Sequence, residues 1–298
     1  MSRPRVIDYE GSKYSVEFWS PAREYEDRAE RIALRALLPP TGRRLIDVGA
    51  GAGRLGALYL GYDEVVLMDY ARSTLLEARQ RWGRDPRFKF VAADVYRLPF
   101  VDAACDTAVM VRVMHHLADV PRALGQIAAA LRPGGALVVE FANKRNLKSM
   151  LRYALRRQAW SPYARQPVEF VELNFDFHPA WLKERIEAAG FEVRRQRSVS
   201  FFRLGALKRV FGARALAALD RLLQRPLAPL VIAPSQFLKC DLRAVAPGRA
   251  DSRPSPPGGL FKCPECASTD WTELPDALAC ANGHRWPVGE GVYDFRSR

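Results

Sequence analysis

Five short apolar runs alternate with helix-like segments in the first half of the chain, and this alternation constrains the fold more than any other feature. The runs are RLIDVG, EVVLMD, FKFVAAD, CDTAVMV and ALVVEF, all within residues 44–141. Strands that alternate with helices favour a parallel sheet, because each connection must cross the sheet before the next strand begins. The sequence therefore predicts an α/β fold, a mostly parallel sheet with helices on both faces.

The whole chain divides into four segments by composition. Residues 22–38 have helical apolar spacing and stop at a Pro-Pro turn, which predicts an N-terminal helical cap over 1–43. The α/β domain covers 44–246, and its last two predicted strands, FEVRRQRSVS and QFLKCDLRAVA, are suited to antiparallel pairing. Residues 247–259 are rich in Pro, Gly and Ser and predict a linker, which leaves 260–298 as a small separate module.

Charge and composition limit the class of protein. The chain has 298 residues, of which 48% are hydrophobic, and a net charge of +13, so disordered and fibrous classes are excluded. No apolar run reaches membrane-spanning length and the first residues contain no apolar signal region, so we expect a cytoplasmic protein. The positive charge favours a nucleic acid, an anionic membrane surface or an anionic small molecule as partner, although an arginine-rich genome would also produce it.

A glycine-rich loop follows the first predicted strand. Asp47 begins it, and Gly49, Gly51 and Gly53 give the spacing G-x-G-x-G before a predicted helix. Glycine allows a tight turn and close approach of a ligand to the backbone, although tight turns between strand and helix use glycine without any ligand. Because Arg54 breaks the G-x-G-x-x-G spacing, a nicotinamide cofactor is disfavoured.

Acidic residues end the first three strands, at Asp47, Asp69 and Asp94. The carboxyl ends of parallel strands meet at one edge of the sheet, where ligands bind in open α/β folds. Asp69 is placed to accept hydrogen bonds from ribose hydroxyls, and Asp94 from an adenine amino group. Each acid taken alone could equally be a helix cap or a turn residue.

These motifs, in this order, resemble those of the class I S-adenosylmethionine-dependent methyltransferases over residues 44–141. The resemblance implies a Rossmann-like fold and S-adenosylmethionine as cofactor. It assigns Asp47 and the three loop glycines to the methionine and sulfonium pocket, Asp69 to the ribose, and Asp94 with the backbone of Val95 to adenine. Val111, Arg112, His115 and His116 follow the fourth strand, where the family faces its substrate.

Methyl transfer to an amine or hydroxyl requires a proton acceptor, and His115 and His116 are the candidates. Both histidines could instead only pack the loop after the strand. Tyr9 and Tyr14, before the first helix, are candidate lid residues or plain surface anchors.

The tail carries the pattern C-x2-C-x13-C-x3-H, formed by Cys263, Cys266, Cys280 and His284. Three thiolates and an imidazole satisfy tetrahedral zinc and leave no open position, so the metal is expected to be structural. The pattern resembles the zinc ribbons of ribosomal RNA methyltransferases and of small methyltransferase activators, although in the ribosomal RNA enzymes the ribbon precedes the catalytic domain. Cys105 and Cys240 are expected to be buried strand residues.

Two basic stretches, 143–165 and 194–214, each contain seven basic and no acidic residues, with aromatic residues between them. This composition slightly favours RNA as the methyl acceptor. The same stretches also read as basic amphipathic helices, which suit a small molecule, quinone or lipid at a membrane surface. A third possibility is a non-catalytic scaffold that binds the donor. The sequence leaves the acceptor atom and the oligomeric state open.

Overall fold

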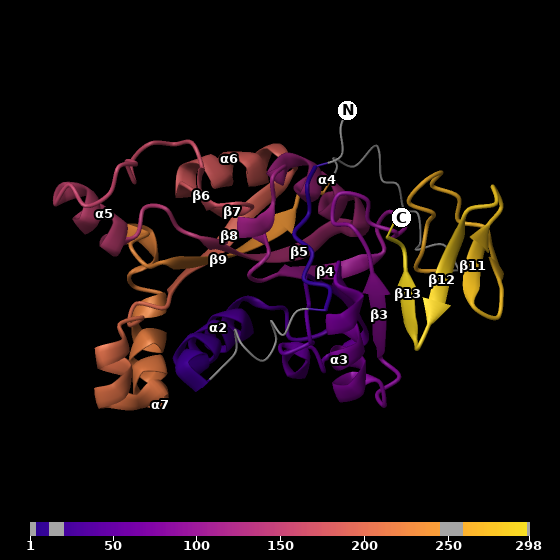
Figure 1. The fold of residues 1–298 in the computed structure, drawn as a ribbon, viewed down its shortest axis with the longest axis horizontal. Helices are drawn as coiled ribbons and strands as arrows, with labels where there is room; N and C mark the ends of the chain where they lie inside the picture. The colour runs from indigo at the N-terminus through magenta and orange to yellow at the C-terminus, as the bar shows by residue number, and fades with distance from the viewer. Residues whose placement is uncertain (1–3, 12–20, 245–258, 297–298) are drawn as a thin grey trace.

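The five apolar runs form five parallel strands in the computed structural model, which describes residues 4–11, 21–244 and 259–296 (Figure 1). They lie in the order β3-β2-β1-β4-β5. Their bounds are β1 (Gly42–Val48), β2 (Tyr62–Asp69), β3 (Phe88–Ala92), β4 (Cys105–Met110) and β5 (Leu131–Ala142). The predicted mostly parallel sheet is confirmed, and β1, β2 and β3 end at or beside the three acids.

Two antiparallel strands continue the sheet beyond β5. They are β8 (Phe191–Val199) and β9 (Ser235–Leu242), and β9 pairs with both β5 and β8. The antiparallel pairing expected from the sequence is thereby confirmed. A separate hairpin of β6 (Val168–Val171) and β7 (Asn174–Asp176), which the sequence did not predict, lies outside this sheet.

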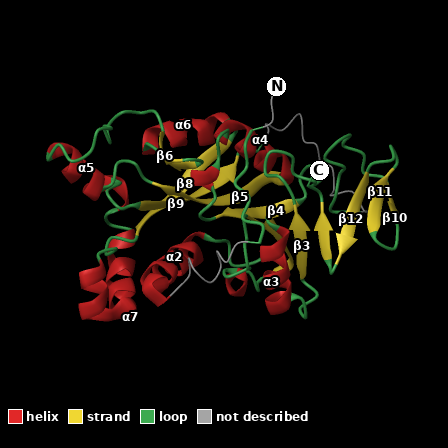
Figure 2. Cartoon of the chain, viewed as in Figure 1, coloured by secondary structure: helices red, strands yellow, loops and turns green. Residues whose placement is uncertain are grey.

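Helices cover both faces of the sheet (Figure 2). On one face α2 (Glu24–Leu37), α3 (Arg72–Trp82) and α7 (Gly205–Gln224) bury apolar side chains in a shared core. On the other face α4 (Val120–Ala130) and α6 (Pro179–Ala188) do the same. The remaining helix, α5 (Leu147–Ala154), contributes only Ser149 to the buried residues. Short 3-10 turns are η1 (Pro21–Arg23), η2 (Gly56–Leu58), η3 (Met114–His116) and η4 (Ala228–Leu230).

The glycine loop does not lead into the α-helix that the sequence predicted. Only the single turn η2 follows it, and the chain turns into β2 at Gly61. Trp82 occupies the space beside this turn, and its indole donates a hydrogen bond of 2.8 Å to the carbonyl of Gly53. A Cβ on Gly56 would lie 2.6 Å from the same ring, so the close packing of Trp82 takes the place of a helix here.

The C-terminal module extends the sheet at its other edge. It consists of β10 (Trp271–Glu273), β11 (Ala277–Cys280), β12 (Arg285–Gly289) and β13 (Val292–Asp294). These strands are antiparallel to one another, and β13 pairs in parallel with β3. Figure 1 shows the module at one end of the molecule, away from α5 and α7. All of the predicted linker except Gly259 lies outside the described residues.

Side-chain packing, in addition to strand pairing, joins the module to the α/β domain. The Phe261 ring lies against Phe100, Tyr293 and Phe295 in the core that α4 and α6 cover. Arg97 pairs with Glu265 at 2.6 Å at the rim of this contact. The module and the α/β domain therefore share one sheet and one core.

Candidate functional site

A cavity of about 560 Å³ lies at the carboxyl edge of β1, β2, β3 and β4. Its volume is in the range of small-molecule and cofactor sites. Of the residues predicted from the sequence, the wall includes Asp47, Gly49, Gly51, Asp69, Val95, Val111, Arg112 and His116. We call it the donor cavity.

The backbone of the glycine loop forms one side of the donor cavity. Gly49 has φ +77°, and a Cβ there would lie 2.0 Å from a methyl carbon of Val113. Gly51 has φ +52°, and a Cβ there would meet nothing within 4 Å. Gly49 must therefore be glycine for packing, whereas Gly51 leaves open space that a ligand can fill. Gly53 is not on the wall, because it packs against Trp82.

Asp69 presents its carboxylate beside the loop. Oδ2 accepts a hydrogen bond from the amide of Gly51 at 2.8 Å, and Oδ1 accepts one from Ala71 at 3.0 Å. Burial nevertheless raises the pKa of Asp69 above its ordinary value. A fixed, partly desolvated carboxylate with spare lone pairs suits a ligand diol that donates two hydrogen bonds.

Asp47 is buried behind the loop. The hydroxyl of Tyr59 donates to its Oδ2 at 2.9 Å. Burial raises the pKa of Asp47 to about 7, against the lowering effects of Tyr59 and of the Arg54 charge. The negative charge of this group would be stabilised by a cation in the cavity.

Asp94 and Val95 occupy different positions. Val95 is on the wall, but Asp94 is not, and its Oδ1 accepts a hydrogen bond of 2.8 Å from the amide of Tyr96. Asp94 therefore holds the turn after β3 in the shape that brings Val95 and Tyr96 to the cavity.

An N-terminal strap, residues 4–11, closes part of the donor cavity through Val6, Ile7 and Tyr9. Tyr9 is close to His116, with 3.2 Å between its hydroxyl oxygen and Nε2. Tyr14 lies outside the described residues. The sequence singled out Tyr9 but gave no signal for Val6 or Ile7, because their role depends on where the strap crosses the sheet.

Glu10 fixes the end of this strap. Its carboxylate accepts hydrogen bonds from the amides of Arg72 and Ser73 at the start of α3. It also pairs at 2.9 Å with Arg296, which follows β13 and donates to the carbonyl of Tyr70 as well. The C-terminal module thus contacts both the strap and the cavity wall at Tyr70.

His115 and His116 lie in the turn after β4 with ring centroids 3.9 Å apart. His116 faces the donor cavity, and its Nδ1 lies 3.0 Å from the carbonyl oxygen of Leu173, so Nδ1 donates and Nε2 can accept from Tyr9. His115 is not on the wall, and its Nδ1 is buried without a hydrogen-bond partner among the described residues. Burial lowers the pKa of both rings, which keeps them neutral near pH 7.

A buried charge network ties β4 to α2 and β5. Arg112, at φ +60°, donates through its amide to Glu140 at 3.0 Å and through Nε to Glu30 at 2.8 Å. Arg54 also pairs with Glu30, at 2.6 Å. Burial would raise the pKa of Glu30, but the charges of Arg112 and Arg54 lower it. The sequence identified Arg112 but not Glu30 or Glu140, which come together only in the folded chain.

A second cavity of about 620 Å³, which we call the α5 cavity, is lined by Ala142, the last residue of β5, and by Asn143, which follows it. Since β5 pairs in parallel with β4, the two cavities lie at the carboxyl ends of neighbouring strands. The wall of the α5 cavity carries four cations, Lys148, Arg152, Arg157 and Arg203, with Trp160, Phe170 and one acid, Asp176. Burial raises the pKa of Asp176 to about 6.

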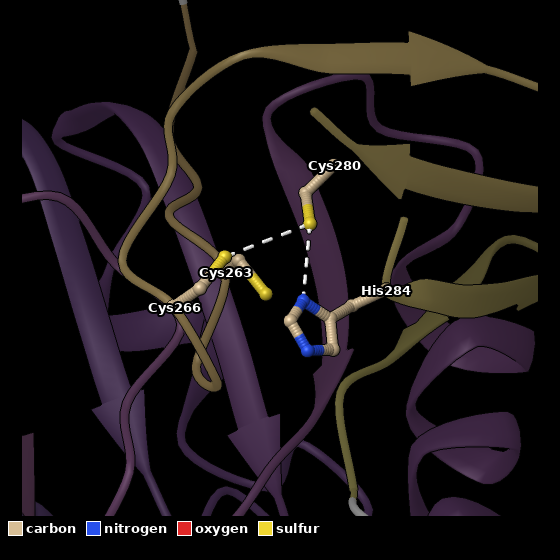
Figure 3. Close-up of side chains that lie close together, drawn as sticks. All are labelled: Cys263, Cys266, Cys280 and His284. Carbon is tan, nitrogen blue, oxygen red and sulfur yellow. Dashed lines mark hydrogen bonds between the residues drawn. The ribbon is translucent and has the colours of Figure 1, made fainter. Parts of the chain in front are cut away.

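The tail brings its four predicted ligands together (Figure 3). The ligand atoms of Cys263, Cys266, Cys280 and His284 all lie within 4.8 Å of one another. The Sγ atoms of Cys266 and Cys280 are 3.7 Å apart, and Sγ of Cys280 lies 3.4 Å from Nδ1 of His284. Zn–S bonds of about 2.3 Å in a tetrahedron give edges of about 3.8 Å, so the set fits zinc. The other two cysteines, Cys105 and Cys240, are buried in strands as expected.

The family model and two relatives that match this chain are described as methyltransferases. Residues 46–139 match the family model described as "Methyltransferase domain". The O-methyltransferase cnsE of Penicillium expansum is 34% identical over 145 residues, 45% of this chain and 52% of that protein. The demethylmenaquinone methyltransferase of Clavibacter sepedonicus is 32% identical over 115 residues, 38% of this chain and 47% of that protein. The chain therefore spans about half the length of these relatives.

The fold has close counterparts among solved structures. An S-adenosylmethionine-dependent methyltransferase from Mesorhizobium loti superimposes with a TM-score of 0.53 at 21% identity, over 72% of this chain and 97% of that one. At this identity the likeness concerns the fold.

Proposed function

We propose that this chain is a class I S-adenosylmethionine-dependent methyltransferase and transfers a methyl group from that donor to an acceptor bound beside it. The observation that carries the proposal is the donor cavity, whose wall combines the glycine loop and Asp69 with His116 and Arg112. The matched domain and the fold support the donor.

The residues of the donor cavity fit S-adenosylmethionine. Asp69 would accept hydrogen bonds from the ribose hydroxyls. The open space at Gly51 would let the ligand approach the backbone of the loop closely. Val95 and Tyr96 would line the adenine, with Asp94 acting through the turn that it holds. Asp47 would face the positively charged end of the donor from behind the loop.

When bound, the donor supplies an electrophilic methyl group on a positively charged sulfur. The protein must hold the acceptor in line with that methyl and keep water out. Val6, Ile7 and Tyr9 of the strap, together with Val111 and Leu117, supply an apolar cover for this purpose. Arg112 is held by Glu30 and Glu140, so the turn between the two cavities is rigid.

If the acceptor is an amine or hydroxyl, an unprotonated base must remove its proton. His116 is neutral, faces the donor cavity and is oriented by the carbonyl of Leu173. We assign it this role ahead of His115, which is not on the wall. Asp176, in the α5 cavity, is a second candidate, because its raised pKa makes it a better base than an ordinary carboxylate near neutral pH.

We place the acceptor in the α5 cavity. It lies at the end of β5, and the neighbouring strand β4 ends at the donor cavity. Its four cations favour an acceptor with an anionic group. RNA, slightly favoured by the sequence, is supported by these cations and by Trp160 and Phe170, on which bases could stack. The second candidate is an amphiphilic small molecule, which the exposed aliphatic residues of α5 favour. The name of the Clavibacter sepedonicus relative gives a quinone acceptor.

The experiment that tests the function supplies radiolabelled S-adenosylmethionine to the purified protein with an extract of cells lacking it. The label is then partitioned among RNA, protein and organic-soluble fractions. Label in one fraction that disappears with Asp69→Ala establishes methyl transfer and the acceptor class. Donor binding without label in any fraction would contradict the proposal and indicate a scaffold.

The proposal includes structural zinc at the Cys263, Cys266, Cys280 and His284 site and the four segments 1–43, 44–246, 247–259 and 260–298. The last segment has only 39 residues and shares its buried core with the α/β domain, so the four ligands would supply stability that so short a module lacks on its own.

A further inference from the structure

We propose that the end of the molecule formed by α5 and the outer side of α7 docks on an anionic phospholipid bilayer. We call this surface the α5–α7 end. The inference rests on the second candidate of the proposed function, an amphiphilic acceptor, since it places the entrance of that acceptor at the membrane. No described helix is long and apolar enough to cross a membrane, so the contact would be with the bilayer surface.

Exposed apolar side chains concentrate at this end. Among the described residues, nine of the fourteen exposed large hydrophobic residues lie in α5, in α7 or at the caps of these helices. The most exposed are Val210 at 75%, Leu222 at 70% and Leu204 at 63%. Soluble proteins scatter such residues singly, and a concentration on one surface indicates an interaction site.

The α5 helix shows how these residues are arranged. Leu147, Leu151 and Leu155 recur every fourth residue, so they form one exposed stripe along α5 and its end. Lys148 and Arg152 follow the first two leucines by one position and lie next to them on the helix, and Arg156 follows beyond the end of α5. Only Ser149 of the helix is buried, so this helix has an amphipathic surface that the rest of the described chain does not cover.

The α7 helix repeats this composition. Its inner side packs on α2 through Leu216 and Ala217, and Asp220 accepts a hydrogen bond from Tyr25. The backbone of α7 is broken at Gly212, which has φ +71°, so α7 consists of two helical segments. Arg209, Val210 and Phe211 are exposed on the first segment, and Arg214, Leu219, Arg221 and Leu222 are exposed on the second. Asp220 is the one acid in α5 and α7, and it is fully buried, so the exposed charge of both helices is positive.

The two helices belong to one end of the molecule. The amide of Leu147, where α5 begins, donates a hydrogen bond of 2.8 Å to Ile232, in the connection that follows α7. Figure 1 shows both helices at the end opposite the C-terminal module. The α5 cavity lies between them, since its wall includes Ser149 of α5 and Arg203, just before α7.

The aliphatic stripe distinguishes a bilayer from RNA as partner. Arginines attract phosphate in either partner, but bases bind by stacking on aromatic rings and gain little from exposed leucine and valine. A bilayer surface takes both kinds of side chain, with the aliphatic residues in the acyl boundary and the cations at anionic headgroups. An acceptor dissolved in that bilayer would enter the α5 cavity without crossing water.

The test measures sedimentation of the full-length protein with vesicles of phosphatidylcholine alone or with added phosphatidylserine. Two triple variants probe the two components without touching the wall of the α5 cavity. The apolar variant is Leu147→Ser, Leu151→Ser and Leu155→Ser, and the charge variant is Arg156→Gln, Arg209→Gln and Arg214→Gln. The control variant removes the same charge from exposed arginines elsewhere, through Arg35→Gln, Arg84→Gln and Arg285→Gln.

We expect the unmodified protein to bind vesicles that contain phosphatidylserine, and both test variants to lose affinity at least about tenfold. The control variant should stay within about twofold. Circular dichroism checks that all variants are folded.

Vesicle binding that is equal in the apolar variant and the unmodified protein would overturn the proposal. So would RNA binding that is lost in the charge variant and kept in the apolar variant, with no vesicle binding. Because sedimentation requires no methyl donor, its failure is distinguishable from failure of methyl transfer. Label in the organic-soluble fraction without vesicle binding would leave the function intact and reject the docking surface.

Discussion

Single residues at the carboxyl edge of the sheet determine what the donor cavity can bind. Asp69 is held by two backbone amides and has lone pairs to spare, whereas Asp47 is buried and accepts a hydrogen bond from Tyr59. Both carboxylates end strands, yet their surroundings give them different tasks. One is poised to bind a neutral diol, and the other to balance a positive charge.

We expect Asp69→Ala to weaken binding of S-adenosylmethionine about tenfold to a hundredfold, because it removes hydrogen bonds to a charged acceptor. Isothermal titration calorimetry gives the affinity. Asp63→Ala, which changes an exposed acid at the start of the same strand, is the matched control. Equal affinities in the two variants would remove Asp69 from the ribose site.

Asp47→Asn should change how stability depends on pH. Burial raises the pKa of Asp47 to about 7 in the folded chain, against about 4 in the unfolded chain, so the folded state loses stability as pH rises through this window. Asparagine carries no charge and avoids this loss. Urea unfolding without donor should show the variant gaining about 2 kcal/mol or more relative to the unmodified protein between pH 5 and pH 8. If the free energies of unfolding of the variant and the unmodified protein differ by the same amount at pH 5 and pH 8, the pKa of Asp47 is not raised.

Alanine substitutions at Gly49 and Gly134 allow the free-energy cost of backbone strain to be distinguished from the cost of a steric clash. They have φ of +77° and +75°, but a Cβ at Gly134 would meet nothing within 4 Å, whereas one at Gly49 would meet Val113 at 2.0 Å. We expect Gly134→Ala to lower the free energy of unfolding by about 1–2 kcal/mol and Gly49→Ala by about 1–3 kcal/mol more. Equal losses in urea unfolding would show that Val113 yields at no cost.

At the scale of elements, the strap and the C-terminal module act on the donor cavity together. The strap covers the cavity, and Arg296 after β13 fixes it through Glu10. Arg296 also pairs with Asp294 at 2.6 Å, so its position follows that of β13. An element far along the sequence thereby becomes part of the donor site.

Arg296→Ala should loosen the strap and weaken donor binding several-fold, since a partly buried charged hydrogen bond contributes about 1.5–3 kcal/mol. Amide hydrogen exchange in residues 4–11 should become faster, and calorimetry should show the lower affinity. Arg285→Ala is the control, because Arg285 lies in the same module, has an exposed side chain and pairs with Asp276 at 3.9 Å. If the two variants have equal rates of amide hydrogen exchange in the strap and equal affinities for the donor, the C-terminal module does not influence the donor cavity through Arg296.

At the scale of the whole molecule, one sheet runs from the C-terminal module to β8. The module is therefore not a structurally independent domain, because β13 pairs with β3 and Phe261 packs in the main core. The strand order also separates two ends of the molecule, with the C-terminal module at one and the α5–α7 end at the other (Figure 1).

Removal of zinc should consequently destabilise the whole molecule. We expect a strong chelator to lower the Tm of a single unfolding transition by at least about 10 °C, because structural zinc contributes much of a small module's folding free energy. Calorimetry follows the transition, and readdition of zinc is the control. An unchanged Tm for the main transition, with only a small separate loss, would show that the module unfolds alone.

The sequence by itself determined the features that depend on neighbouring residues. The apolar runs fixed β1 to β5, the acids at their ends marked the ligand edge, and the ligand spacing of the tail brought Cys263 and His284 to one site. Periodicity, tight turns and metal-ligand spacing are local, so each is legible in a short stretch of chain. The helix expected after the glycine loop failed because Trp82, from another element, fills the space beside it.

Only the tertiary structure decided which distant segments meet. The crossing of the strap over the donor cavity, the pairing of β13 with β3 and the Glu30–Arg112–Glu140 network join residues far apart in sequence. The same holds for the α5 cavity, whose wall combines α5, the hairpin and Arg203. Such contacts have no local pattern, because they depend on how complete elements pack and on which sheet edge remains free.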